Sequence, residues 1–154
     1  MQLLQFAATV LLSFMGMPAG YFLASITKEE LPTAKKYFPF LTALVFVAAI
    51  ALSANYYNLK IAVKAALYII ATLAFAVKAN SAVLYFILGV IIGFASRSAE
   101  AVMVLSSLVF LFGLLAGSTS FRKRLEFREL LPILAKNSVY IAGAFLAFEA
   151  LMIA

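Results

Sequence analysis

The side chains that could carry out chemistry in this chain are few and of limited kinds. The 154 residues include six acids, all of them glutamate, and no cysteine, histidine or aspartate. The usual zinc sites, Ser-His-Asp and Cys-His nucleophile systems, and aspartate dyads are therefore excluded. Ser/Lys chemistry stays formally open, although no residue pairing singles it out. We expect a protein that is not an enzyme and that holds no metal and no other cofactor.

Two charged residues stand inside apolar runs, and both are candidates for a functional site. Glu149 lies five residues before the last residue, in the final apolar run. Acids within membrane-spanning segments are costly and often mark proton or cation pathways. Lys64 lies in an earlier run and could pair with Glu149 across two helices. The alternative is that each side chain simply reaches the membrane surface.

Pro18 is the third candidate, because it interrupts the first apolar run between Gly16 and Gly20. A proline inside a helix removes one backbone hydrogen bond and strains the carbonyl four residues earlier. A broken helix in a membrane exposes carbonyls that can coordinate an ion or a substrate. The alternative is a kink that neighbouring helices satisfy by packing. We name Pro18, Lys64 and Glu149 as a candidate solute or ion site.

The elements that would position these residues are membrane-spanning helices. Hydrophobic residues make up 66% of the chain and charged residues 12%, against about 45–50% and 25% in soluble domains. A span needs about 17–25 residues. The sequence predicts an all-α polytopic integral membrane helix bundle, a single domain over 1–154 with about six transmembrane helices. The apolar stretches run over roughly 3–27, 39–57, 61–78, 81–96, 101–118 and 133–154.

Glycine spacing predicts how the helices pack. Six of the seven glycines form three GxxxG pairs, each inside an apolar stretch: Gly16 and Gly20, Gly89 and Gly93, and Gly113 and Gly117. Glycines four residues apart share one helix face and let two backbones approach closely in lipid. We expect packing within the bundle, with association between two copies as the alternative. The first and third pairs also resemble each other, which indicates a faint internal repeat.

The distribution of basic residues predicts the orientation. Nine of the twelve lysines and arginines lie in the first, third and fifth breaks between the apolar stretches. The positive-inside rule then places these breaks in the cytoplasm and both termini outside the cell membrane. The net charge of +6 therefore points to the bilayer surface as a partner, and not to nucleic acid. The first stretch lacks a preceding basic segment, so we expect a span and not a cleaved signal peptide.

The fifth break is predicted to form a helix of its own over about 119–131. Apolar residues could form one side of it, while Arg122 and Glu126, four residues apart, lie on the other. Such a helix would lie in the cytoplasmic interface, and the alternative is a solvated basic loop. Four basic residues would contact anionic lipid: Arg122, Lys123, Arg124 and Arg128.

These features favour a small transporter or channel-like protein for an ion or small solute. The alternative is a non-catalytic accessory or scaffold subunit of a membrane protein complex, which would dock through its glycine faces and its basic segment. The expected partners are the lipid bilayer, a small solute or ion, and either another membrane protein or a second copy of the chain.

Overall fold

The computed structural model describes residues 2–57, 61, 65, 68–69, 80–121 and 127–153. The described residues confirm the all-α fold class, since they form helices and no strand. The elements in chain order are α1 (Leu3–Phe14), α2 (Gly16–Ile26), α3 (Leu31–Ala34), α4 (Phe38–Tyr56), α6 (Ser81–Ala95), α7 (Ala99–Ser120), α8 (Phe127–Asn137) and α9 (Val139–Ile153).

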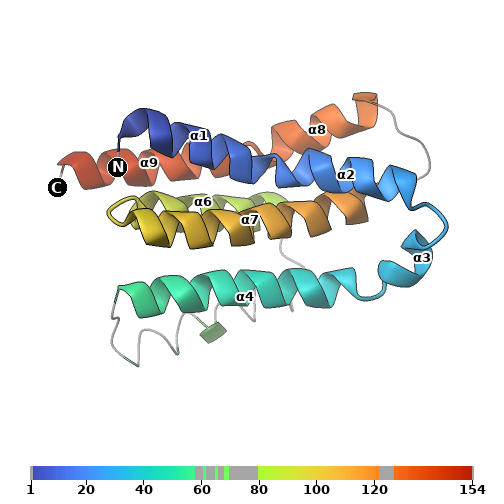
Figure 1. The fold of residues 1–154 in the computed structure, drawn as a ribbon, viewed down its shortest axis with the longest axis horizontal. Helices are drawn as coiled ribbons and strands as arrows, with labels where there is room; N and C mark the ends of the chain where they lie inside the picture. The colour runs from blue at the N-terminus through green and yellow to red at the C-terminus, as the bar shows by residue number, and fades with distance from the viewer. Residues whose placement is uncertain are drawn as a thin grey trace.

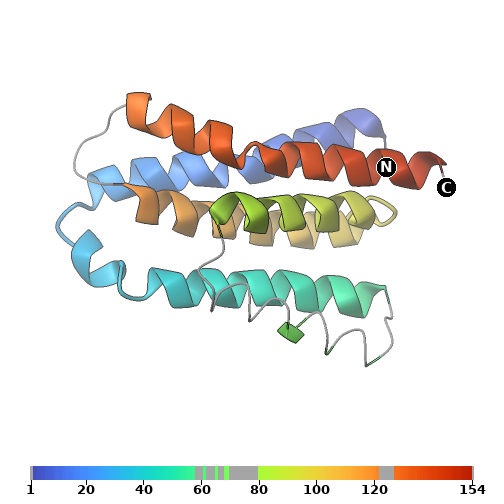
Figure 2. The same ribbon diagram turned by 180° about the vertical axis from the view of Figure 1, so that it is seen from behind.

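The long helices lie side by side along one common direction (Figures 1 and 2). Helices α1, α2 and α7 run one way, and helices α4, α6, α8 and α9 run the other way. Both termini lie at one end of the bundle, beside the turn between α6 and α7. Helix α3 and the connection from α7 to α8 lie at the opposite end. This arrangement is the one expected for helices that cross a layer of lipid.

The number of long apolar helices differs from the six spans that the sequence predicts. Among the described residues, four helical segments are long and apolar enough to cross a membrane: Leu3–Ile26, Phe38–Tyr56, Ala99–Ser120 and Arg128–Ile153. Helix α6 has only 15 residues, or about 22 Å at 1.5 Å per residue, against a hydrocarbon core of about 30 Å. It is short because the Ser96–Ser98 turn follows it and Asn80 caps its start.

Two other expected boundaries also shift. The predicted third span, 61–78, lies almost wholly outside the described residues, and so does the middle of the predicted interfacial helix, 122–126. The first residues of that predicted helix, 119–120, complete α7, and its last residues, 127–131, begin α8. Helix α8 continues through Pro132 to Asn137. The predicted last stretch, 133–154, starts just after Pro132, whereas the structure places Pro132 inside α8, which is described from Phe127.

The first and third glycine pairs meet each other where α2 crosses α7. A Cβ atom on Gly16 would lie 2.9 Å from Cα of Phe110, and one on Gly117 would lie 2.9 Å from the backbone nitrogen of Tyr21. Carbon atoms in contact are about 3.5–4.0 Å apart, so only glycine fits there. The two segments that resemble each other in sequence therefore pack face to face in parallel helices.

A second close crossing joins α6 to α9. A Cβ atom on Gly93 would lie 2.6 Å from Cβ of Ala147, and one on Gly143 would lie 2.8 Å from the carbonyl oxygen of Phe86. Gly89 faces the backbone of Tyr140 in the same way. All seven glycines thus face backbone of another helix in the same chain. Two parallel helix pairs in the bundle, α2 with α7 and α6 with α9, are thus joined by glycine contacts, and the two pairs run in opposite directions.

Candidate functional site

The first span is interrupted at its middle. Helix α1 ends at Phe14 and α2 begins at Gly16, with Met15 between them. Pro18 lacks an N–H group, so it cannot donate the usual hydrogen bond to the carbonyl of Phe14. The backbone N–H of Met15 keeps the usual helical hydrogen bond to the carbonyl of Leu11 at 3.1 Å and also lies 3.2 Å from that of Leu12, so the chain is kinked here and not unwound. The break lies twelve residues from the start of the span and eleven from its end.

The last span is interrupted as well, at Ser138, between α8 and α9. No proline or glycine stands at this break. Ser138 donates its hydroxyl hydrogen to the carbonyl of Ala135 at 2.8 Å, and its backbone N–H to the carbonyl of Leu134 at 2.8 Å. A side chain that bonds to its own helix in this way competes with regular helix geometry and often bends it.

The two breaks lie opposite each other. Ser13, just before the first break, and Tyr140, just after the second, join their hydroxyl oxygens at 2.7 Å. On the other side of the breaks, the amide nitrogen of Asn137 lies 3.8 Å from the sulfur of Met17. The contacts pair residue 13 with 140 and residue 17 with 137, as antiparallel helices require. Two interrupted helices therefore meet at the centre of the bundle.

Tyr85 of α6 adds a fourth polar side chain at this level. Its ring lies 6.2 Å from the rings of Phe14 and Tyr140 and 5.0 Å from that of Phe112, between ring centroids. Its hydroxyl oxygen would lie 3.2 Å from a Cβ atom on Gly113. We call the set of Ser13, Tyr85, Asn137 and Tyr140 the central polar cluster. Their exposed fractions are 3%, 0%, 1% and 0%.

Hydrogen bonding within the central polar cluster is incomplete. The hydroxyl of Tyr85 and the side-chain oxygen of Asn137 have no hydrogen-bond partner in the described part of the chain. Asn137 donates its amide hydrogens to the carbonyl of Ile133 at 2.8 Å and toward Met17. An unpartnered buried polar group is costly, about 1–3 kcal/mol. The described part of the cluster therefore holds one hydroxyl and one amide oxygen whose hydrogen-bonding capacity is unused.

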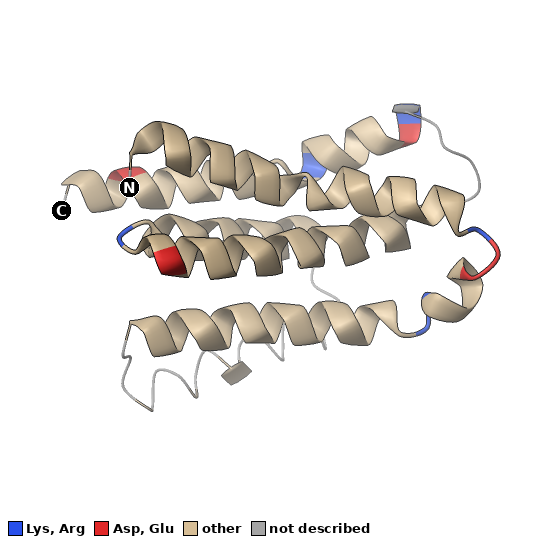
Figure 3. Ribbon diagram, viewed as in Figure 1, with Lys and Arg blue, Asp and Glu red and all other residues tan. Residues whose placement is uncertain are grey.

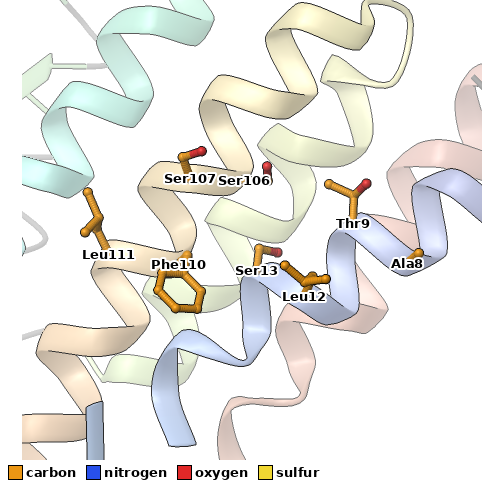
Figure 4. A pocket seen from close by; sticks show the side chains of 8 residues that line it. All are labelled: Ala8, Thr9, Leu12, Ser13, Ser106, Ser107, Phe110 and Leu111. Atoms are coloured by element: carbon orange, nitrogen blue, oxygen red, sulfur yellow. The ribbon is translucent and has the colours of Figure 1, made fainter. Parts of the chain in front are cut away.

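A groove opens beside the cluster on the outer surface, between α1 and α7 (Figure 4). Its volume is about 550 Å³. Ala8, Thr9, Leu12 and Ser13 line it from α1, and Ser106, Ser107, Phe110 and Leu111 line it from α7. Ser13 belongs to both the groove and the central polar cluster, so it connects the surface of the bundle to the interior.

The structure does not bring the three candidate residues from the sequence together. Pro18 is partly buried in α2, and Glu149 is exposed on α9. Phe148, beside Glu149, stacks on Phe6 with ring centroids 4.5 Å apart, and Phe6 lies twelve residues before Pro18, about 18 Å along a helix. Lys64 lies outside the described residues. Pro18 lies three residues after Met15, where α1 and α2 meet, and Glu149 is distant from this point.

Of the four residues expected to contact anionic lipid, only Arg128 lies among the described residues. Arg128 is exposed in the first turn of α8. Arg122, Lys123 and Arg124 lie outside the described residues. Lys28, Lys35 and Lys36 flank α3, and Arg128 lies at the start of α8. Figure 3 shows blue segments at this end of the bundle, and also in the turn between α6 and α7 and at the end of α8. Lys35 donates to the carbonyl of Phe121, just after α7, at 2.6 Å.

Sequence reasoning missed the central polar cluster because none of its members is charged. A signal was present nonetheless. Tyrosines in membrane proteins concentrate at the two interfaces, whereas Tyr85 and Tyr140 stand within apolar runs. Asn137 is likewise a polar residue inside the predicted last span, 133–154. Comparison with protein-family models, with curated proteins and with solved structures finds no match to this chain.

Proposed function

We propose that this chain is a small integral membrane transporter or channel-like protein for a small solute or ion. One observation carries the proposal: two helices break opposite each other at mid-span, beside buried polar groups of Tyr85 and Asn137 that lack partners. Interrupted helices at the bilayer midplane form the binding sites of many transporters. Irregular backbone at that depth is tolerated only against protein or a polar cavity.

The chemistry of the central polar cluster favours a polar solute that both donates and accepts hydrogen bonds. The four side chains are two phenols, one aliphatic hydroxyl and one amide, and none of them is charged. Such groups replace part of a solute's hydration shell, and they do not compensate a full charge in a medium of low dielectric constant. A small neutral solute is therefore the best match to the cluster, and an ion is the second.

We propose further that the protein is a multi-pass protein of the cell membrane, with both termini outside and the basic connections in the cytoplasm. The described lysines and arginines at the end opposite the termini support this orientation (Figure 3), since cytoplasmic connections are enriched in basic residues. The connection 121–127, which joins α7 to α8, contains Arg122, Lys123 and Arg124. The anionic lipid of the inner leaflet is the partner that this end would contact.

Reconstitution into liposomes tests the transport proposal. Efflux of a panel of labelled neutral solutes and monovalent ions is compared between empty liposomes, the wild type and Tyr85→Phe. We expect flux of at least one solute in the wild type. Tyr85→Phe should reduce this flux about tenfold, because it removes one hydrogen bond to the solute, worth about 1.5 kcal/mol at the upper end of the usual range. Thr42→Val, in α4 and away from the cluster, serves as the control and should leave flux unchanged.

Absence of flux for the whole panel would overturn the proposal, and so would equal flux in the wild type and Tyr85→Phe. Absent flux would favour the alternative, an accessory or scaffold subunit. In that case the docking surface would have to differ from the glycine faces, because all seven glycines face helices of the same chain.

A further inference from the structure

We propose that the groove between α1 and α7 binds an uncharged amphiphile of the lipid phase, one with an apolar chain and a single hydroxyl or amide donor. This inference goes beyond transport, because binding in the groove requires no flux across the bilayer. It assigns a ligand class to a surface that carries no charged residue.

The size and walls of the groove fit such a ligand. Its volume of about 550 Å³ lies within the range of about 300–1,000 Å³ for small-molecule sites. Leu12, Phe110 and Leu111 form apolar walls, and Leu12 is 70% exposed at the outer rim. This rim faces outward from the bundle, where acyl chains would contact a membrane-embedded protein. The ligand would therefore enter sideways from the lipid.

The hydroxyl groups of the groove select a ligand that donates hydrogen bonds. Thr9 donates its hydroxyl hydrogen to the carbonyl of Gln5, and Ser106 and Ser107 both donate to the carbonyl of Met103, each at 2.9 Å. A hydroxyl has one hydrogen and two lone pairs, so each of these oxygens can still accept. The groove thus presents three acceptors whose own hydrogens are already engaged.

Ser13, at the inner side of the groove, also has its hydroxyl hydrogen engaged by a carbonyl of its own helix. It donates to the carbonyl of Val10 at 2.8 Å, so the hydroxyl of Tyr140 supplies the hydrogen for their shared contact. All eight lining residues are uncharged, and a charged headgroup would lose its hydration there without gaining an opposite charge. The ligand that matches these groups is neutral, carries a donor, and has an apolar body.

A pair of photoreactive probes tests the inference on the wild-type protein in phosphatidylcholine nanodiscs. The first probe is a long-chain alcohol with a diazirine in its chain, and the second is its methyl ether, which keeps the oxygen but has no donor. We expect the alcohol to label peptides from α1 and α7 at least about threefold more than the ether, the effect of one modest hydrogen bond. Mass spectrometry of the digested protein locates the labels.

Matched variants separate the groove from the general lipid-facing surface. Thr9→Val, Ser106→Ala and Ser107→Ala together should reduce labelling by the alcohol to the level of the ether. Thr42→Val with Ser25→Ala serves as the control, because both hydroxyls donate to carbonyls of their own helices away from the groove. The control should label like the wild type.

Several results would overturn the inference. Equal labelling by alcohol and ether would show that the ligand needs no hydrogen-bond donor. Labels spread evenly over the lipid-facing helices would show that the groove is not a specific site. Unchanged labelling in the triple variant, or an equal loss in the control, would do the same. The flux assay decides the transport proposal separately, so either proposal can fail while the other stands.

Discussion

Substituting Gly20 by alanine should destabilise the protein, although alanine favours helix formation. An added Cβ atom would lie 2.7 Å from Cα of Leu114 and nearer still to its carbonyl oxygen. Carbon contacts need about 3.5–4.0 Å, so α2 and α7 must move apart by about 1 Å. Backbone atoms cannot rotate away, so we take the upper end of the overpacking penalty, about 3 kcal/mol.

Helix propensity opposes this penalty by about 1 kcal/mol, the advantage of alanine over glycine. The net loss of unfolding free energy for Gly20→Ala is therefore about 2 kcal/mol, or about 30-fold in the unfolding equilibrium constant. Unfolding of the purified protein in mixed micelles by added dodecyl sulfate, followed by circular dichroism, measures this change. Ala19→Leu, on the exposed face of the same helix, is the control and should shift stability by less than about 0.5 kcal/mol.

Double substitutions test whether the glycines act as one crossing. Gly20 and Gly117 lie at the same crossing, so once α2 has moved away from α7 the second methyl group should add little. Gly20→Ala with Gly93→Ala affects two crossings that share no partner, and these effects should add within about 0.5 kcal/mol. A stabilising or neutral Gly20→Ala, or full additivity of Gly20→Ala with Gly117→Ala, would refute the assigned helix pairing.

Three further substitutions follow from the contacts of single side chains. Tyr140→Phe breaks a 2.7 Å hydrogen bond and should lower the unfolding free energy by about 1 kcal/mol, whereas Tyr85→Phe removes a buried hydroxyl without a partner in the described part of the chain and should raise it by about 1–3 kcal/mol. Lys35→Met removes the donor to the carbonyl of Phe121 and should cost about 1 kcal/mol in the same titration. Glu149→Gln alters an exposed side chain away from the central polar cluster and should leave solute flux unchanged. Equal losses for the two tyrosines, an unaltered Lys35→Met, or abolished flux in Glu149→Gln would each contradict the geometry.

Some of this architecture could be predicted from local sequence, because local rules determine it. The length of the second apolar stretch predicts a helix over 39–57, and the observed helix, Phe38–Tyr56, agrees with it to within one residue at each end. Pro18 predicts an interruption in the first span, which the structure places at Met15, because a proline inside a helix affects the preceding turn. The short helix α6, which falls below the length of a span, has a local cause too, since the apolar stretch at 81–96 is already shorter than a typical span.

The rest depends on contacts between distant parts of the chain. A single sequence does not show that Ser13 faces Tyr140. Whether each of these polar groups has a hydrogen-bond partner depends on that contact. Ser138 breaks the last span without a proline or glycine, so its position gave no strong signal. Charge drew attention to Glu149, whereas the buried groups without partners belong to the uncharged Tyr85 and Asn137.

The most direct test of the membrane-spanning bundle uses single cysteines, which is practical because the chain contains none. Ser98→Cys lies in the turn between α6 and α7, Thr33→Cys lies in α3 at the opposite end, and Ser13→Cys lies at the centre. A membrane-impermeant maleimide is added outside sealed cells, and then after lysis. We predict reaction of Ser98→Cys from outside, of Thr33→Cys only after lysis, and of Ser13→Cys in neither condition. Reaction of Ser98→Cys and Thr33→Cys from the same side would contradict a bundle that spans the bilayer.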